Sequence, residues 1–585
     1  MTDIQNPTRG RVVAQGEFSN ATRYLCAAAY LDSTFMRRVL EEVLYPAHRG
    51  VAPSYGIDVA PIARHCLTAN KRVLARDGVI CLLLTVLVVC LPSDLALLVL
   101  ALYGVVLLLR LLTAFAARDF SSIVGTLVVL LAAGLLLLLN TRVQASATPS
   151  LEYVLDPNGG FQVAEVGGSG VATTAIAVTM ALAVVGVLAW HRISVHATVV
   201  NELQRERFST SAAPEEPRWA RRRLSYLDHI RDSNVTVFSE SVTTKPFVGS
   251  GDITRAWSFA IPLREATGTF VPSPLGSSGD GGGARPPSRP DGEFSALVLY
   301  DRLRRAIAGL ATADLPENER LQALSIRDRL YVSGMLPETS PYLDPDSHLP
   351  VTRVDWDHVL RVASGERGPE RHYQVTRISA WEGEVEVSVF IYTAVQGSML
   401  FLELVATVLP SIKPVYHEID AYEKLNGGVA ARCVGSSVLD LVRVAPMSPV
   451  HLAEYAVRAL TRTMRARQEE RSISDRLSFD YGARMSVREL GARQSPVFFQ
   501  NLDAEQRVAL VERRVVASVV DTLEEFGLDP QEFGSRVMNL YNSTLISNSS
   551  VQNSALASGS SPMSRIANFA SNASHAARTN PGSPS

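Results

Sequence analysis

The longest apolar runs of the sequence fall between residues 73 and 190, and they are longer than a soluble helix would bury. A helix needs about 20 residues to cross the hydrocarbon core of a bilayer. Only Ser93 and Asp94 separate the apolar parts of the first two runs, which predicts a tight helical hairpin. The pattern predicts a membrane protein with four α-helical transmembrane spans, at about residues 73–92, 94–117, 121–140 and 171–190.

Lysine and arginine near the span ends predict the orientation, because basic loops stay on the cytosolic side. Basic residues precede the first span, lie between the second and third, and follow the fourth, whereas the loop 141–170 contains only Arg142. We therefore expect a multi-pass protein of the cell (plasma) membrane, with both termini in the cytosol and 141–170 as the external loop. Within this loop, LEYVLDPNGGFQVAEV is typical of two short strands joined by a turn.

The composition of the spans argues against transport. An ionisable residue inside a span usually marks a substrate or ion route. None lies near the centre of a span here, because Arg76 and Asp77 belong at the headgroups and Arg110 can extend to the interface. Anchoring is the simpler interpretation, and a transporter subunit is the weaker alternative.

Outside the spans, short alternating segments and amphipathic segments replace the apolar runs. They predict a cytosolic α+β domain containing an antiparallel sheet, formed by residues 191–266 and 293–541. Residues 1–72 are expected to form an N-terminal cytosolic helical segment. Two polar stretches lack the apolar surface needed to fold. Residues 267–292 are expected to be a disordered insertion and 542–585 a low-complexity, disordered tail, with a short solenoid as the alternative for the tail.

Three consecutive segments, RHYQVTRISAW, EGEVEVSVFIYTAV and QGSMLFLELVATVLP, are separated by glycine-containing turns. They predict a three-stranded antiparallel meander. In the middle strand the valines share one face, while Glu384, Glu386 and Ser388 share the other. We therefore expect one buried face and one face that is at least partly exposed to water.

Two long helices are predicted after the meander. In Asn501–Asp529, apolar residues recur at helical spacing from Val508 onward. Asp503 suits the N-cap of this helix and Gly527 its C-terminal stop. The segment Ser448–Glu470 opens with serine and proline, which are typical of a helix start.

Composition narrows the functional classes. The chain has 585 residues, too many for one hydrophobic core, so several domains are expected. Its 56 Lys plus Arg nearly balance its 58 Asp plus Glu, and no nucleic-acid partner is expected. The five cysteines are odd in number and form no CxxC pair, which disfavours a disulfide framework and a zinc site.

The sequence contains no GxSxG, HExxH, kinase or P-loop lysine motif. His65 and Cys66 are adjacent and would point about 100° apart on a helix, which disfavours a nucleophile pair. Asp344, Asp346 and His348 alternate around a proline, a pattern that favours a plain turn over a metal site. We therefore predict no catalytic, cofactor-binding or metal-binding residue, and no cofactor.

The segment NVTVFSESVTTKPFVGSG, residues 234–251, places a candidate strand before a glycine loop, as phosphate-binding loops do. It contains only Gly249 and Gly251, Lys245 precedes them, and the following RAWSFAIPL is typical of a strand. Without a helix N-terminus, no dipole points at an anion. We interpret the loop as a structural turn in which both glycines adopt positive φ.

Several segments together resemble an uncharacterised family of multi-pass membrane proteins of actinobacteria such as Streptomyces: TRYLCAAAYLD, APSYGIDVAPIARHCLTA, NVTVFSESVTTKPFVGSG with RAWSFAIPL, and LSFDYGARMSVREL with VERRVVASVVDTLEEFGLD. The resemblance extends over nearly the whole chain and implies a source and a location, not an activity. Members are often similar to NVTVYSGYSPFVGSG in the glycine segment. This sequence differs from that pattern between Phe238 and Lys245, which argues against a fixed catalytic role for Glu240 or Lys245.

These observations favour a membrane-anchored protein whose cytosolic domain acts as a scaffold or sensor through protein contacts. The alternative is a membrane-tethered enzyme that acts on a nucleotide or a lipid headgroup. The lipid bilayer is the first expected partner, together with a protein partner or self-association. Arg221, Arg222 and Arg223 are candidates for contact with anionic lipid.

Overall fold

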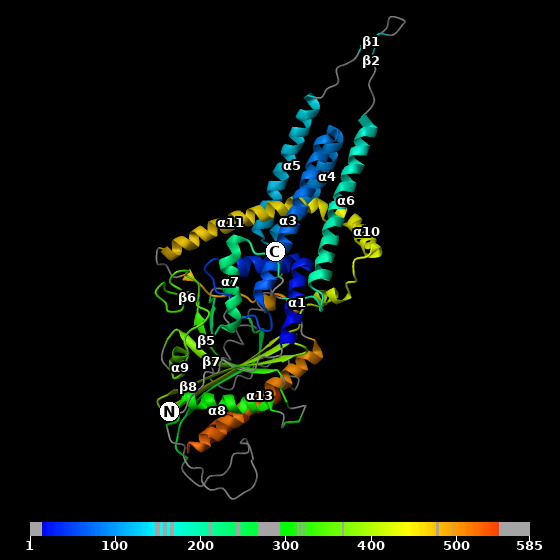
Figure 1. Ribbon diagram of the computed structural model, residues 1–585. Helices are drawn as coiled ribbons and strands as arrows, with labels where there is room; N and C mark the ends of the chain where they lie inside the picture. Colours follow the sequence, from blue (N-terminus) through cyan, green and yellow to red (C-terminus); the bar gives the residue numbers. More distant parts are fainter. Residues whose placement is uncertain are drawn as a thin grey trace, which may run out of the picture.

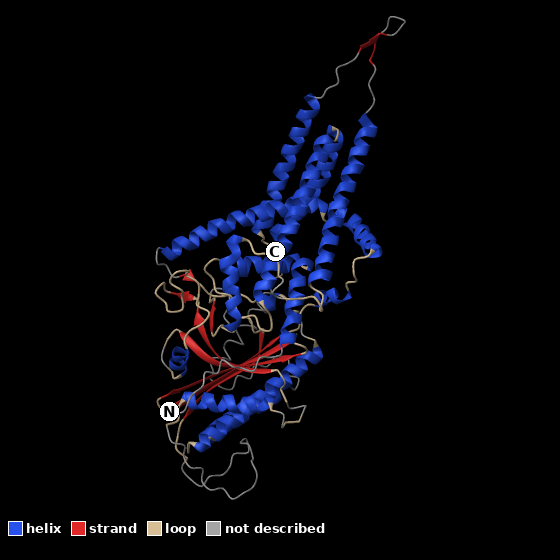
Figure 2. Ribbon diagram, viewed as in Figure 1, coloured by secondary structure: helices blue, strands red, loops and turns tan. Residues whose placement is uncertain are grey.

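The computed structural model describes residues 15–146, 153–155, 161–163, 169–209, 213–240, 246–266, 293–312, 315–316, 320–321, 323–365, 368–474, 479–494 and 497–548. Along its long axis the molecule has three layers: a bundle of apolar helices, a pair of helices that cross beneath the bundle, and a domain built on a sheet (Figure 1). The main sheet lies in the layer farthest from the bundle (Figure 2). The predicted insertion 267–292 and residues 549–585 of the predicted tail lie outside the described residues.

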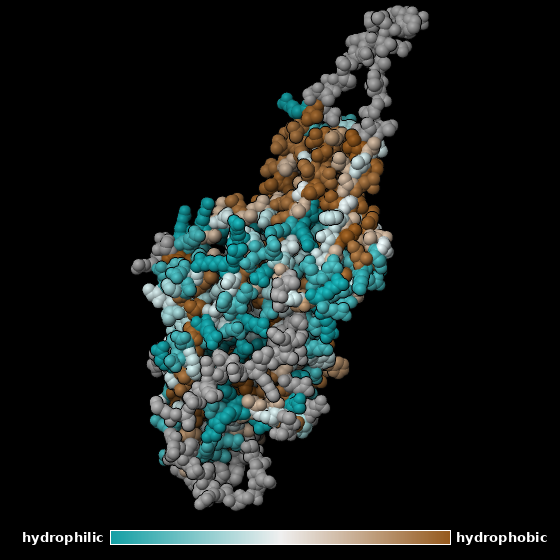
Figure 3. All heavy atoms as spheres, viewed as in Figure 1, coloured by the Kyte–Doolittle hydropathy of each residue, from teal (hydrophilic) through white to brown (hydrophobic). Residues whose placement is uncertain are grey.

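The predicted number of spans is confirmed. Leucine and valine side chains cover the outer surface of the bundle, which is as apolar as lipid requires (Figure 3). Between the third and fourth helices, β1 (Tyr153–Leu155) and β2 (Phe161–Val163) form the expected antiparallel hairpin. Four helices are long and apolar enough to cross a membrane: α3 (Val59–Cys90), α4 (Ser93–Ala116), α5 (Phe120–Ser146) and α6 (Ser169–Glu202).

The last carbonyl oxygens of α3 receive hydrogen bonds inside the bundle. The side-chain amide of Asn140, on α5, donates to the carbonyl oxygens of Val88 and Leu91, both at 2.9 Å. A helix leaves its last carbonyls without partners, and lipid offers none. Asn140 therefore stabilises the tight connection between α3 and α4, which then packs against α5.

Helix α3 is longer than the span predicted within it. Its first turns, from Val59 to Ala69, are buried against α1 (Gln15–Leu31), α2 (Ser33–Val39) and α7 (Arg221–His229). This packing extends the helix through the polar residues that precede the apolar run. At 1.5 Å per residue, α3 is a rod of about 48 Å that joins the bundle to the rest of the protein.

A six-stranded sheet has the strand order β3-β5-β7-β8-β9-β4. Strand β3 pairs in parallel with β5, and the other neighbouring pairs are antiparallel. The predicted meander is β7–β8–β9, and the predicted fold class, four apolar helices plus an α+β domain, is confirmed. The strands are β3 (Val235–Phe238), β4 (Asp252–Pro262), β5 (Leu324–Ser333), β7 (Glu370–Ala380), β8 (Val385–Gln396) and β9 (Met399–Leu409), with a separate pair of β6 (Met335–Leu336) and β10 (Phe479–Asp480).

One face of the sheet packs against α8 (Ala296–Ala308) and α13 (Phe498–Glu525), on the side away from the bundle (Figure 1). The valines of β8 and the apolar stripe of α13 belong to one buried cluster, as their spacing predicts. The predicted N-cap of α13 is wrong, because the helix begins at Phe498. Asp503 lies inside it, and its carboxylate accepts a hydrogen bond from the indole of Trp381 at 3.1 Å.

The opposite face of the sheet is buried as well, which corrects the expectation of a partly wet face. The exposed fractions of Glu386 and Ser388 are 1% and 0%. On the same face the rings of Phe247 and Phe390 stack with centroids 4.1 Å apart. The N-terminal chain, the loop before β4 and α12 (Val487–Leu490) cover this face. Alternation within one strand cannot reveal such a cover.

Two helices lie across the base of the bundle: α10 (Gly427–Arg443) packs beside α6, and α11 (Ser448–Ser474) runs beneath α3 and α5 (Figure 1). The remaining helices are α9 (Trp356–Ala363), near β7, and α14 (Gln531–Asn548), which follows α13. Helix α14 continues into the segment 542–585, so residues 542–548 are helical. The crossing of α11 and α5 positions the candidate site.

Candidate functional site

Helix α5 lies directly against α11 at Gly125. A Cβ atom on Gly125 would lie 2.8 Å from Cγ and 3.2 Å from Cα of Glu454. Real Cβ atoms do not approach other atoms this closely, so the crossing requires a residue without a side chain. Gly125 thereby lets Glu454 reach the underside of the bundle.

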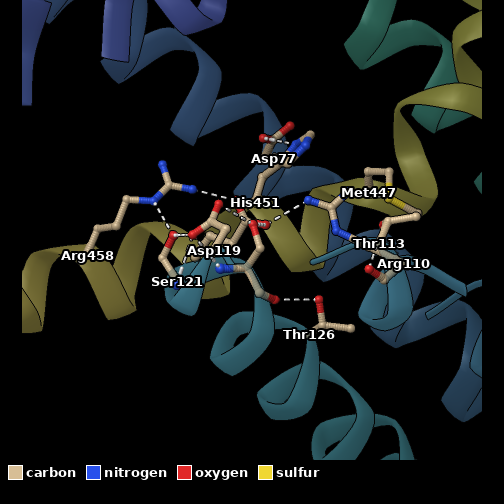
Figure 4. Close-up of polar contacts among 11 residues, drawn as sticks. Asp77, Arg110, Thr113, Asp119, Ser121, Thr126, Met447, His451 and Arg458 are labelled. Atoms are coloured by element: carbon tan, nitrogen blue, oxygen red, sulfur yellow. Dashed lines mark hydrogen bonds and ion pairs between the residues drawn. The ribbon is translucent and has the colours of Figure 1, made fainter. Parts of the chain in front are cut away.

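The Glu454 carboxylate collects hydrogen bonds from three helices. Arg110 of α4 donates to its Oε1 at 2.7 Å, and Ser122 of α5 donates to the same oxygen at 3.0 Å. Arg458, one turn further along α11, donates to Oε2. Figure 4 shows Arg110 and Arg458 approaching from opposite sides. Glu454 is only 3% exposed, and a buried carboxylate is tolerated only with such compensation.

A second buried carboxylate, Asp77 on α3, connects the first span to the same crossing helix. Its Oδ1 accepts hydrogen bonds from Arg76 Nε at 2.9 Å and from Ser448 Oγ at 3.2 Å. The ring nitrogen Nδ1 of His451 lies 3.5 Å from its Oδ2 (Figure 4). Ser448 and His451 belong to the first turn of α11, so this turn is attached to α3.

Together, Glu454 and Asp77 tie α3, α4 and α5 to α11. Removing one partner from a buried ion pair costs about 3–5 kcal/mol, because the remaining charge is left without compensation. Both oxygens of the Glu454 carboxylate accept hydrogen bonds. Asp77 accepts them at Oδ1, while its Oδ2 has the His451 ring 3.5 Å away as its charged neighbour and no hydrogen bond among the described residues. These contacts fix the relative positions of the helices.

A cavity of about 310 Å³ lies beside this network, lined by residues of α2, α3, α6 and α11. Arg37, Arg462, Tyr45 and Asn70 form part of its wall. The guanidinium carbon of Arg462 lies 3.9 Å from the centre of the Tyr45 ring. Within the described part of the chain, neither Arg37 nor Arg462 forms an ion pair. The wall therefore carries two cations that form no ion pair with the described residues.

Sequence analysis placed Asp77 and Arg110 at the membrane interface but did not connect them with Glu454. Arg110 and Glu454 are 344 residues apart in the chain, and no local pattern joins them. One usable signal was present. Val450, Glu454 and Val457 share one face of the predicted helix, and an acidic residue in an apolar stripe calls for a buried cationic partner.

The glycine loop before β4 has the predicted conformation, with φ of 96° at Gly249 and 85° at Gly251. The amide N–H groups of both glycines donate to Glu489 Oε1, at 2.9 and 3.1 Å. Burial raises the pKa of the Glu489 carboxyl, although these hydrogen bonds oppose the shift. The anion that the loop holds is thus a side chain of α12, which sequence analysis did not identify.

The other histidine and carboxylate candidates occupy structural positions. His65 Nδ1 lies 3.0 Å from the hydroxyl of Tyr30, inside a buried cluster, and Cys66 is fully buried beside it. The Asp344 side chain accepts the backbone N–H of Asp346 at 3.1 Å and that of the next residue at 2.8 Å. This is the plain turn that the sequence favoured over a metal site.

The three consecutive arginines of α7 have different surroundings. Arg223 is buried, and its guanidinium donates to the carbonyl oxygens of Val43 and Arg49 at 2.9 and 2.8 Å. Arg221 pairs with a glutamate at 3.2 Å, and Arg222 is exposed. Arg223 therefore stabilises the packing of α7. Of the three arginines, only Arg221 and Arg222 are exposed enough to contact lipid.

No group of three or more His, Cys, Asp or Glu side chains that could hold a metal ion occurs in the described ranges. Glu240 is exposed just beyond β3, and Lys245 lies outside the described residues.

Comparison with known proteins bears on the sheet domain. A family model described as an AbeC-like domain matches residues 256–554, about half of the chain. The match begins within β4 and includes α10, α11 and α13, while the four spans lie outside it. No curated protein and no solved structure matches the chain. The chain belongs to the AbeC-like family.

Proposed function

We propose that the protein is a membrane-anchored scaffold or sensor whose sheet domain lies in the cytosol and acts through protein contacts. The buried Glu454 network carries this proposal, because it fixes α11 to the spans. The other end of α11 is fixed to the sheet domain, where Ile473 joins a buried cluster with residues of β3 and β5. Nearby, Glu469 pairs at 3.0 Å with Arg49 of the N-terminal chain. A shift of the spans would therefore be passed on to the sheet domain.

An exposed apolar patch on the sheet domain supports the proposed protein contacts. Phe498 and Phe499, at the start of α13, are 75% and 66% exposed, with Leu502 and Trp381 beside them. Exposed patches of large apolar residues commonly mark protein-binding surfaces. Helix α13 lies on the side of the sheet away from the bundle (Figure 1), so a partner here would not compete with the membrane.

The proposal also includes the membrane in which the protein lies and the side on which its sheet domain is found. The basic residues near the span ends support a cytosolic sheet domain in the plasma membrane, and the resemblance described above supports an actinobacterial source. A reporter that is active only in the cytosol should work when fused after Ser209 and fail when fused at Asn158. Activity at Asn158 would reject this topology.

The contact surface can be tested by site-specific photo-crosslinking in native membranes. A photoreactive residue at Phe499 should give a discrete adduct with a partner or a second copy of the chain. The matched control is the same residue at Arg305, an exposed position on α8 that is not part of the patch. Equal crosslinking at both positions would argue against a scaffold that acts through this surface.

A lipid-directed enzyme is the second candidate, and one observation favours it. The cavity beside α11 presents Arg37 and Arg462 without ion-pair partners in the described residues. Such a cavity suits a phosphate-bearing headgroup, which supports binding of a lipid by this candidate enzyme.

A further inference from the structure

The cavity beside α11 has more positive than negative charge in its wall. The wall contains four arginines and three carboxylates. Two of the carboxylates, Asp77 and Glu454, already accept hydrogen bonds from arginines. The third, Glu41, cannot balance both Arg37 and Arg462, which have no ion pair among the described residues. An anion bound here would neutralise the remaining charge.

The donors in the wall suit a phosphate group. Arg462 stacks on Tyr45, and its guanidinium also lies 5.6 Å from the ring centre of Tyr455. The Nε of Arg462 donates to the carbonyl oxygen of Arg458 at 3.1 Å. This hydrogen bond and the stacking orient the guanidinium before a ligand arrives, and its terminal N–H groups are of the kind that binds phosphate oxygens in pairs. Asn70 adds an amide to the wall. The volume of about 310 Å³ is in the range of small-molecule sites.

The cavity lies at the level of lipid headgroups. Trp190 is 74% exposed, and the next residue, His191, lines the cavity. Tryptophan is enriched where a span leaves the hydrocarbon core. On α3, Asp77 also lines the cavity, and the apolar run begins directly after it. The apolar surface of the bundle gives way to polar surface near its base (Figure 3).

We propose that this cavity binds the phosphate group of an anionic lipid from the leaflet that faces the sheet domain. A soluble phosphate ester shares the same chemistry, but the position at the membrane interface favours the lipid. The inference deepens the proposed function, because a lipid held between α2, α3 and α11 would stabilise the joint that Glu454 forms. The amount of anionic lipid in this leaflet would then set how rigidly the spans are connected to α11.

The test uses the full chain in nanodiscs of phosphatidylcholine, with or without phosphatidylglycerol. The anionic lipid should raise the midpoint of thermal unfolding of the unmodified chain. In the double variant Arg37→Gln/Arg462→Gln, more than half of this rise should be lost. The midpoint of each variant in pure phosphatidylcholine is its own reference, so a general loss of stability does not enter the comparison.

The matched control is Arg38→Gln/Arg465→Gln, which removes two exposed arginines from the same helices but none from the wall. It should keep the full rise. A third variant, Asn70→Asp, adds a carboxylate to the wall at nearly constant volume and should lose the rise without losing an arginine. Equal losses in the control and the wall variants, or no loss in either, would overturn the proposal.

Inorganic phosphate separates the two sources of the ligand. Added to phosphatidylcholine nanodiscs, it should not reproduce the rise at millimolar concentration. A full rise that depends on Arg37 and Arg462 would instead assign the site to soluble phosphate and reject the lipid. The crosslinking at Phe499 does not enter this measurement, so failure of the lipid site and failure of the protein contacts are distinguishable.

Discussion

Replacing Gly249 by alanine should destabilise the sheet domain strongly, because this position has no room for a Cβ atom. Its φ of 96° costs a residue other than glycine about 1–3 kcal/mol. An added Cβ would also lie 2.1 Å from the carbonyl oxygen of Pro53, so the N-terminal chain would have to move. Such overpacking typically costs about 1–3 kcal/mol. We therefore expect a loss of about 2–6 kcal/mol.

Gly251 is constrained in the same way, with a φ of 85° and a Cβ that would meet the carbonyl oxygen of Val408 at 2.3 Å. The loss in the double variant should be smaller than the sum of the single losses. Both glycines donate to the Glu489 carboxylate, and substitutions that share a partner are not additive. The buried Glu489 carboxylate would lose a stabilising hydrogen bond once the N–H of either glycine moved away.

The assay is thermal unfolding of the full chain in one detergent, followed by tryptophan fluorescence. The control is Gly309→Ala, at the end of α8, where φ is −58° and no atom lies within 4 Å of the added Cβ. A loss of 1 kcal/mol lowers the midpoint by about 2–4 °C in a domain of 150–250 residues. We expect the Gly249→Ala midpoint to fall by about 4–24 °C and that of the control to stay nearly unchanged.

Two results would refute this reasoning. One is a Gly249→Ala midpoint within about 1 °C of the control, which would mean that the loop is not packed against the N-terminal chain. The other is saturable binding of ATP or GTP that disappears in the Gly249→Ala/Gly251→Ala variant while the fold survives. The loop would then be a nucleotide site and not a turn that holds Glu489.

Three further predictions concern the joint and the sheet. In a double-mutant cycle of Glu454→Gln and Arg110→Gln, chemical unfolding should give a coupling free energy of about 1–3 kcal/mol. If the two losses of unfolding free energy were simply additive, the pair would not connect the helices. Gly125→Ala should lower the unfolding midpoint by forcing α11 away, at a cost of about 1–3 kcal/mol, while Gly134→Ala on the same helix, where no atom lies within 4 Å, should not. The Asp328 side chain, on β5, is buried beside His372 and Arg304. Burial alone would raise the pKa of the Asp328 carboxyl, but hydrogen bonds from these two residues lower it below the ordinary value. The contribution of Asp328 to stability is therefore present above about pH 4 and is lost as the pH falls through the folded pKa. Asp328→Asn should then flatten the acid side of a plot of unfolding midpoint against pH. An unchanged acid side would contradict this assignment.

The sequence by itself determined the elements whose signal is local. The apolar runs predicted four spans, and alternation predicted β7, β8 and β9. The spacing of valines predicted the buried face of α13, and the two glycines predicted a turn with positive φ. Each of these features depends on the backbone and on residues a few positions away. Periodicity therefore carries the information without any knowledge of the fold.

Only the tertiary structure decided which segments cover polar groups and which charges meet. Alternation predicted that the Glu386 face of the sheet is partly exposed to water, but the N-terminal chain, the loop before β4 and α12 bury it. Glu489 reaches Gly249 from 240 positions away, and Glu454 reaches Arg110 from 344 positions away. Partner choice over such separations depends on how whole helices cross, which at Gly125 is set by the missing side chain. No local pattern encodes that crossing, so the site at the base of the bundle was visible only in the folded chain.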